Sequence, residues 1–185
     1  MPFAFNLIFD PKTSLEVERL YASLIAFGIP KHDLITQYEP CVTILVVGDR
    51  VRPAFVVDVL KLRLPEMGSV PAALTEPCII DGTPPALSLR VRPTDALLTL
   101  HNLIFNELPE EEVHLHYRPA YWQPHVKLAN VHGGRAADAR LAVRMAAEWH
   151  MLAGELNALQ VLQYPPVQAI WHVPLKDATA GTRNT

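Results

Sequence analysis

Residues 121–131 run YWQPHVKLANV, and the rest of the chain is best interpreted outward from them. From His125 onward the side chains alternate, with His125 and Lys127 on one face and aliphatic residues on the other. A period of two predicts a half-buried strand, and Pro124 fits its start because proline cannot donate to a sheet ladder. If the polar face lines a cleft, an imidazole and an ammonium lie together where they can bind an anion and move a proton.

A second stretch has the same layout, since residues 39–47 run EPCVTILVV. Pro40 is followed by Cys41 and Thr43, which share one face of a predicted strand just as His125 and Lys127 do. One such strand start lies in each half of the chain. The pattern therefore predicts two similar lobes, each of which contributes one strand to a shared site.

The two stretches together resemble the paired motifs of the 2H phosphoesterase superfamily, which includes bacterial 2′-5′ RNA ligase-like proteins and cyclic phosphodiesterases. Members carry two His-x-Thr/Ser motifs about this far apart, and proline commonly precedes the second. Thr43 and His125 match that pattern. Cys41 stands where the first histidine belongs, and Lys127 stands where the second Thr/Ser belongs. The resemblance covers nearly the whole chain in its order of elements and is more specific in layout than in chemistry.

This resemblance implies an α+β protein with a bilobal fold, in which two mostly antiparallel sheets with helices outside surround a central cleft. In the family, the two histidines act as general acid and base on a 2′-3′ cyclic phosphate or a 2′-5′ linkage, and the hydroxyls hold phosphate oxygens. The corresponding catalytic candidates here are His125, Thr43, Cys41 and Lys127. With one histidine missing, the first hypothesis is a weak, divergent phosphoesterase, and the second is a non-catalytic nucleotide- or anion-binding module.

Four further residues are candidates for substrate contacts, each with an ordinary structural alternative. Arg90 and Arg92 share a face of a predicted strand and either contact phosphate in the cleft or are simply solvated. Tyr121 and Trp122 can stack on a base, but aromatic residues beside proline more often pack against the protein.

Cysteine and histidine elsewhere give weaker signals. Cys41 is more often an inert core thiol than a nucleophile paired with His125, which is the third hypothesis. His114 and His116 share a face of a predicted strand, but no third ligand has a recognisable spacing, so neither a metal nor another cofactor is predicted.

Composition bounds the class of protein. The 185 residues, half of them hydrophobic and 19% charged, predict one globular domain over residues 1–176 and a disordered tail over 177–185. The net charge of −3 argues against duplex DNA as a partner. The expected ligand, a small nucleotide or an RNA-end phosphate, is what the resemblance to the 2H phosphoesterases implies. The sequence shows no signal peptide and no long apolar run, and its two cysteines suit a reducing cytoplasm; it does not determine the oligomeric state.

Periodicity and turn signals predict the remaining elements. A helix is expected from a capping box at residues 13–16, a second after Pro53, a third after Thr94 and a fourth over about 136–152. The predicted strands cover residues 3–9, 41–47, 78–80, 87–91, 159–163 and 167–173, in addition to the one that begins at His125.

Overall fold

The computed structural model describes residues 2–31, 35–36, 39–64, 67–132, 144–145 and 149–176. Three α-helices and seven strands alternate irregularly along this part of the chain. In chain order they are β1 (Phe3–Phe9), α1 (Pro11–Ala26), β2 (Cys41–Val47), α2 (Pro53–Arg63), β3 (Val70–Ile80), β4 (Ala86–Val91), α3 (Asp95–Phe105), β5 (His125–Asn130), β6 (Leu152–Gln163) and β7 (Gln168–Pro174). Two short 3₁₀ helices, η3 (Glu110–Glu112) and η4 (Leu115–Tyr117), precede β5. None of the helices among these residues combines the length and the apolar character that a membrane span requires.

All strands pair antiparallel in one sheet of order β2-β1-β6-β3-β4-β5, and β7 joins on β6. Strand β6 is shared: it pairs with β1 over residues 156–163, with β3 over 152–156 and with β7 over 158–163. The predicted α+β class and two-lobed arrangement are confirmed, but the two expected sheets are halves of one sheet. The reason is that β6 is longer than predicted and its first residues pair with β3.

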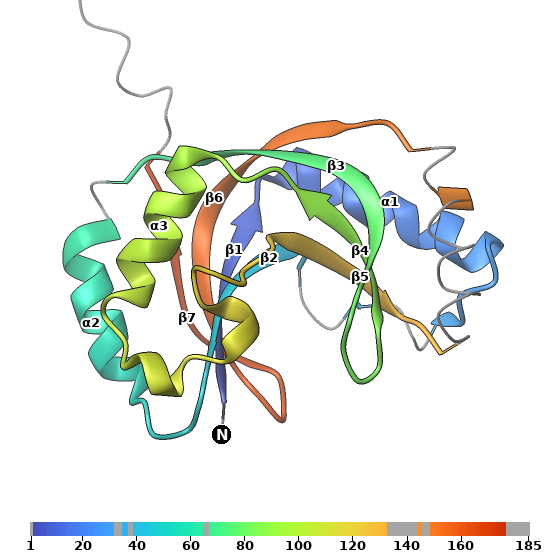
Figure 1. Ribbon diagram of the computed structural model, residues 1–185. Coiled ribbons are helices and arrows are strands. Elements are labelled where there is room, and N and C mark those ends of the chain that lie inside the picture. Colours follow the sequence, from blue (N-terminus) through green and yellow to red (C-terminus); the bar gives the residue numbers. More distant parts are fainter. Residues whose placement is uncertain are drawn as a thin grey trace, which may run out of the picture.

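The two lobes of the sheet curve around a common interior, and the helices lie outside (Figure 1). Figure 1 shows α2 and α3 together on one side of the strands, and α1 on the opposite side. Strand β1 lies in the middle of the first lobe, and all seven of its residues are buried. Phe3, Phe5, Leu7 and Phe9 belong to the main hydrophobic core, so the intervening side chains of β1 face the other way.

Helix α1 begins earlier than the sequence predicted. Its N-cap is Asp10, whose carboxylate accepts hydrogen bonds from the Thr13 backbone N–H at 3.0 Å and from the Thr13 hydroxyl at 2.6 Å. The expected capping box starting at Thr13 is therefore wrong, because Pro11 occupies the first helical turn. Asp10 also accepts from the backbone N–H of Glu155 at 2.9 Å, which ties this helix end to β6.

Helix α3 follows the prediction closely. The Thr94 hydroxyl accepts a hydrogen bond from the Leu97 backbone N–H at 3.2 Å and so caps the helix. Its buried side chains are Leu97, Leu100, His101 and Ile104, as the periodicity indicated.

The end of the predicted fourth helix is wrong. Leu152 is the first residue of β6, and Gly154 lies inside that strand instead of following a helix. Most of the predicted helix, the turn at residues 133–134 and the tail at 177–185 lie outside the described residues.

Gly154 has a packing reason to be glycine, which gives a stability prediction. A Cβ atom at this position would lie 2.0 Å from the Thr13 hydroxyl oxygen and 2.8 Å from the Thr13 Cβ atom. We expect Gly154→Ala to lower the free energy of unfolding by about 1–3 kcal/mol, since β6 and α1 must move apart. Urea denaturation measures the loss.

The matched control is Gly68→Ala, where the nearest atom to an added Cβ is 3.8 Å away. This variant should stay within about 0.5 kcal/mol of the parent. Equal losses in the two variants would show that the contact between Gly154 and Thr13 does not limit stability.

Candidate functional site

The interior face of the first lobe carries the residues of the first motif. Asn6 of β1 pairs with Thr43 of β2, and Ile8 pairs with Cys41, so these four side chains share a face. The register shifts between Phe5 and Asn6, which is the mark of a β-bulge in β2. This face forms the floor of a cleft between the lobes.

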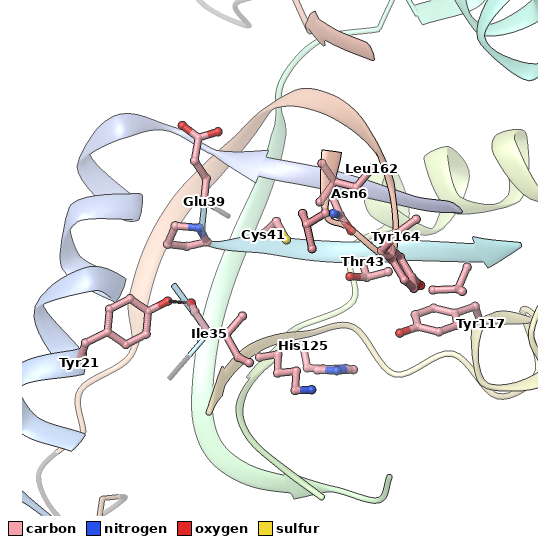
Figure 2. Close-up of a pocket in the computed structure, with 15 residues that line it drawn as sticks. Asn6, Tyr21, Ile35, Glu39, Cys41, Thr43, Tyr117, His125, Leu162 and Tyr164 are labelled. Atoms are coloured by element: carbon pink, nitrogen blue, oxygen red, sulfur yellow. Dashed lines mark hydrogen bonds between the residues drawn. The ribbon is translucent and has the colours of Figure 1, made fainter. Parts of the chain in front are cut away.

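The cleft, here called cleft A, has a volume of about 310 Å³. Thr43 and Cys41 of β2 line it from one lobe, and His125 of β5 lines it from the other (Figure 2). Lys127 of β5 also lines the cleft. The remaining lining residues are Ala4, Asn6, Tyr21, Ile35, Glu39, Pro40, Val46, Tyr117, Leu162, Tyr164 and Val167. The structure thus brings together all four catalytic candidates, although their separation in sequence is large.

A second cleft, cleft B, has a volume of about 430 Å³ and adjoins the first. Tyr117, His125 and Lys127 line both clefts. Cleft B is otherwise formed by residues of the β3–β4 turn and by His114, His116, Tyr121, Trp122 and Gln123. The polar face of β5 therefore lies at the junction of two hollows.

The imidazole of His125 is oriented by its own backbone neighbourhood. Its Nδ1 lies 2.7 Å from the carbonyl oxygen of Gln123, which fits a tautomer in which Nδ1–H donates and Nε2 keeps its lone pair. Burial lowers the pKa of His125, and the positive charges of Lys127 and Arg90 lower it further, while the bond to Gln123 opposes them. A neutral ring with a free Nε2 can act as a base or accept a hydrogen bond.

Lys127 places an ammonium group in the same cleft. The side chain is half-buried, and this desolvation lowers the pKa of Lys127. Among the described residues, no carboxylate forms an ion pair with it. The group is therefore available to bind an anionic ligand.

Cys41 is unsuited to nucleophilic chemistry. Its side chain is only 6% exposed, and burial together with the nearby Glu39 carboxylate raises the pKa of Cys41 to about 12. The reactive species of cysteine is the thiolate, which is scarce near neutral pH at such a pKa. The hypothesis of a Cys41–His125 nucleophilic pair is therefore disfavoured, and the inert thiol is favoured.

The aromatic candidates separate into one structural residue and one exposed residue. The Trp122 ring stacks on His101 with ring centroids 4.1 Å apart, and its indole N–H donates to the Thr43 carbonyl at 3.1 Å. Trp122 is therefore largely buried by contacts within the protein, although it also lines cleft B. Tyr121 is 58% exposed and lines cleft B.

The two arginine candidates line neither cleft A nor cleft B. Arg90 donates from Nε to the Glu76 carboxylate at 3.0 Å, and Arg92 lies with its Nη2 3.9 Å from the Met151 sulfur. The solvated alternative is therefore favoured for both. Arg90 still acts on the site at a distance, because its charge helps to lower the pKa of His125.

The prediction that His114 and His116 share a strand is wrong. His116 belongs to η4, and its ring centroid lies 5.3 Å from that of His114. Within the described ranges, no group of three or more His, Cys, Asp and Glu side chains is placed to hold a metal ion.

Sequence reasoning missed several residues of cleft A. Tyr21, Tyr117 and Tyr164 all line it, and burial is the first cause that raises the pKa of each phenol. Asn6 was also missed, although it is conspicuous as the polar residue in the apolar run FAFNLIF. A polar side chain in a strand that is otherwise apolar was the available signal.

No family model matches the chain, and no curated protein sequence does either. Solved structures with the same fold do exist. The protein TT0787 of Thermus thermophilus has a TM-score of 0.61 at 14% identity, with 96% of this chain and 100% of that one covered. A phosphoesterase has a TM-score of 0.57 at 13% identity and coverages of 95% and 98%, and E. coli LigT in its apo form has 0.55 at 12% with 96% and 99%. The chain has the 2H phosphoesterase fold.

The electrostatic coupling in cleft A predicts how His125 titrates. We expect its pKa below the ordinary value of about 6.5, and Lys127→Met should raise it because a like charge that disfavours the imidazolium is removed. NMR titration of the imidazole C–H resonances measures both values. The control, Arg92→Met, removes a cation outside both clefts and should leave the His125 titration unchanged. A native pKa at or above 6.5 would contradict the buried, neutral ring.

Proposed function

We propose that this protein is a divergent phosphoesterase of the 2H type that acts slowly on a nucleotide or RNA-end phosphodiester. The bond is a 2′-3′ cyclic phosphate or a 2′-5′ linkage. The observation that carries the proposal is the convergence of Thr43, His125 and Lys127 on cleft A, with Nε2 of the imidazole free and the ammonium without a carboxylate partner among the described residues. The two free cysteines support the cytoplasmic location expected from the sequence.

The chemistry follows from the protonation states. In-line displacement at phosphorus needs a base on the side of the attacking oxygen and an acid on the side of the leaving oxygen. A neutral His125 takes the proton from the attacking hydroxyl or water. The Thr43 hydroxyl and the Lys127 ammonium stabilise the charge on the phosphoryl oxygens.

The four motif positions lack a suitable second residue to act as general acid or base. Cys41 occupies the position of the other histidine, but its thiol is short, buried and protonated near neutral pH. Loss of one acid or base typically costs about 10²- to 10⁴-fold in rate. Slow turnover is therefore part of the proposal.

Solved structures of a fold neighbour support the ligand class. E. coli LigT has been crystallised in complex with 3′-AMP, ATP, NADP⁺ and phosphate. For this chain we infer a small ligand with a nucleotide phosphate, since cleft A offers an ammonium, a hydroxyl and an imidazole together.

A second candidate function is a non-catalytic nucleotide-binding module. Two features of cleft A favour it. Lys127 stands where the family pattern has a hydroxyl residue, and its ammonium strengthens anion binding. The Cys41 thiol in the same cleft is unsuited to act as a general acid or base. The two candidates differ in turnover, and the variants described next separate them.

The first test concerns the anion site. We expect Lys127→Met to weaken the binding of adenosine 3′-phosphate by about tenfold or more, because one charge-assisted contact to phosphate is lost. Isothermal calorimetry measures the affinity. Arg92→Met is the matched control, since it removes the same charge away from both clefts and should not change the affinity. Equal affinities of the parent and Lys127→Met would show that the Lys127 ammonium does not bind the phosphate.

The second test rebuilds the missing chemistry. The double variant Cys41→His with Lys127→Thr restores both motifs on a backbone that already has the fold. We expect hydrolysis of 2′,3′-cyclic AMP to rise by at least roughly tenfold, a cautious share of an acid–base contribution. Adding His125→Ala to this variant should abolish the gain, and chromatographic assay of the ring-opened product measures each rate.

The alternative outcomes are informative. No gain in a double variant shown to be folded would favour the binding module over the phosphoesterase. Equal turnover rates of the natural protein and the double variant would show that another group already acts as the second general acid or base.

A further inference from the structure

The junction of the two clefts carries three side chains of different chemistry. Tyr117, His125 and Lys127 line both cleft A and cleft B, and no other described residue lines both. The junction therefore holds a phenol, an imidazole and an ammonium. The proposed function uses the imidazole and the ammonium and gives the phenol of Tyr117 no part.

The backbone of Tyr117 is held in place by the protein behind it. Its N–H donates to the His114 carbonyl at 2.9 Å, and its carbonyl accepts from Nε2 of His101 at 2.9 Å. The buried His101 ring stacks with the rings of Trp122 and Phe105, so this support is itself fixed by packing. A side chain on such a support keeps its direction when a ligand binds.

The phenol of Tyr117 points into cleft A. Figure 2 shows its hydroxyl directed toward the side of the cleft where Thr43 and His125 lie, and no hydrogen bond joins it to another residue that lines cleft A. The side chain is half-buried, and its oxygen is not one of the fully buried, unpartnered polar atoms in the described part of the chain. A ligand in the cleft can therefore contact this hydroxyl.

The other groups of cleft A that carry a proton near neutral pH are less suited to donate it to a ligand. The Tyr21 hydroxyl already donates to a backbone carbonyl at 2.7 Å, and the Cys41 thiol is only 6% exposed. The Lys127 ammonium binds the phosphoryl oxygens in the proposed function. Tyr164 lines cleft A but lies away from the junction with cleft B, where Tyr117 lies.

We propose that Tyr117 is the general acid of cleft A, whose hydroxyl gives a proton to the ribose oxygen that leaves phosphorus. The inference rests on the proposed function, because it takes the phosphate to lie beside Thr43 and Lys127 with His125 as the base. In each turnover, water forms a bond to phosphorus and loses a proton to Nε2 of His125. The bond from phosphorus to the ribose oxygen breaks, and that oxygen takes the Tyr117 proton. Transfer of the imidazolium proton through solvent to the phenolate then restores both groups.

The protonation of the phenol agrees with this role and with slow turnover. Burial is the main cause that raises the pKa of Tyr117 to about 12, and the Tyr164 and Cys41 side chains add to it. The phenol is therefore protonated near neutral pH, but it is a weaker acid than the imidazolium of the family pattern and transfers its proton less readily. Because Cys41 acts on the phenol electrostatically, the phenol lies near the position where the family pattern has its first histidine.

The variant Tyr117→Phe removes one oxygen atom and keeps the ring. We expect its hydrolysis of 2′,3′-cyclic AMP to fall by at least roughly tenfold below that of the natural protein, a cautious share of an acid–base contribution. The loss should lie in kcat with KM unchanged, because the proton moves only in the transition state. Steady-state kinetics with chromatographic assay of the ring-opened product measures both constants. An unchanged kcat would overturn the inference.

The variant Tyr164→Phe is the matched comparison, since it removes another half-buried phenol of cleft A. We expect a smaller fall in kcat than in Tyr117→Phe, because the Tyr164 side chain lines cleft A and does not line cleft B. A larger fall in Tyr164→Phe would assign the general acid to that residue and overturn the proposal.

A substrate with a better leaving group separates proton donation from a structural role of the tyrosine. Thymidine 3′-(4-nitrophenyl phosphate) releases 4-nitrophenolate, which needs no proton to leave. Tyr117→Phe should therefore hydrolyse this ester within about twofold of the rate of the natural protein. Equal losses on the cyclic and the nitrophenyl ester would show that Tyr117 only supports the shape of the cleft, and would contradict the proposal. If the natural protein hydrolyses neither ester, the proposed function itself fails, which is a different result from turnover that does not depend on Tyr117.

Discussion

Strand β6 has to serve both lobes at once, and the shape of the molecule depends on how it does so. One edge of its later residues pairs with β1, while the other edge pairs first with β3 and then with β7. The exchange of partners occurs near Leu156, two residues after Gly154. At this point the absence of a side chain lets Thr13 pack against the strand, and the Asp10 carboxylate binds the Glu155 backbone. Helix α1 is thus anchored where the lobes join, and the two walls of cleft A take their relative position from that junction.

The cleft is also closed by contacts that do not belong to the sheet ladder. Val47 forms an isolated bridge with Val113, and the backbone N–H of His114 donates to the Val46 carbonyl at 2.9 Å. The chain between α3 and β5 is therefore joined to the far end of β2. These contacts bring the polar face of β5 over the floor, where burial and neighbouring cations set the protonation of His125.

Features encoded locally could be predicted from the sequence, and features set by distant contacts could not. The bounds of β2 follow from a proline before it and a glycine after it, and the buried face of α3 follows from its period. The early start of β6 depends on the pairing of residues 152–156 with residues 70–74 of β3, which lie much earlier in the chain. No local pattern contains that information. Asn6 was visible as a polar residue within an apolar strand, but its partnership with Thr43 required the register of the sheet.

The hydrogen bond from the Trp122 indole N–H to the Thr43 carbonyl separates the shape of the cleft from the chemistry of its side chains. It connects the lobes through a backbone atom, so the connection is indifferent to which side chain position 43 carries. Cys41, His125 and Lys127 contribute side chains to the cleft, and the indole of Trp122 bonds and stacks with other residues. The residues that determine the chemistry of the cleft therefore differ from the residues that determine its shape. The side chains of the cleft can therefore be substituted one at a time while the fold is kept, which makes this protein a suitable scaffold for new chemistry.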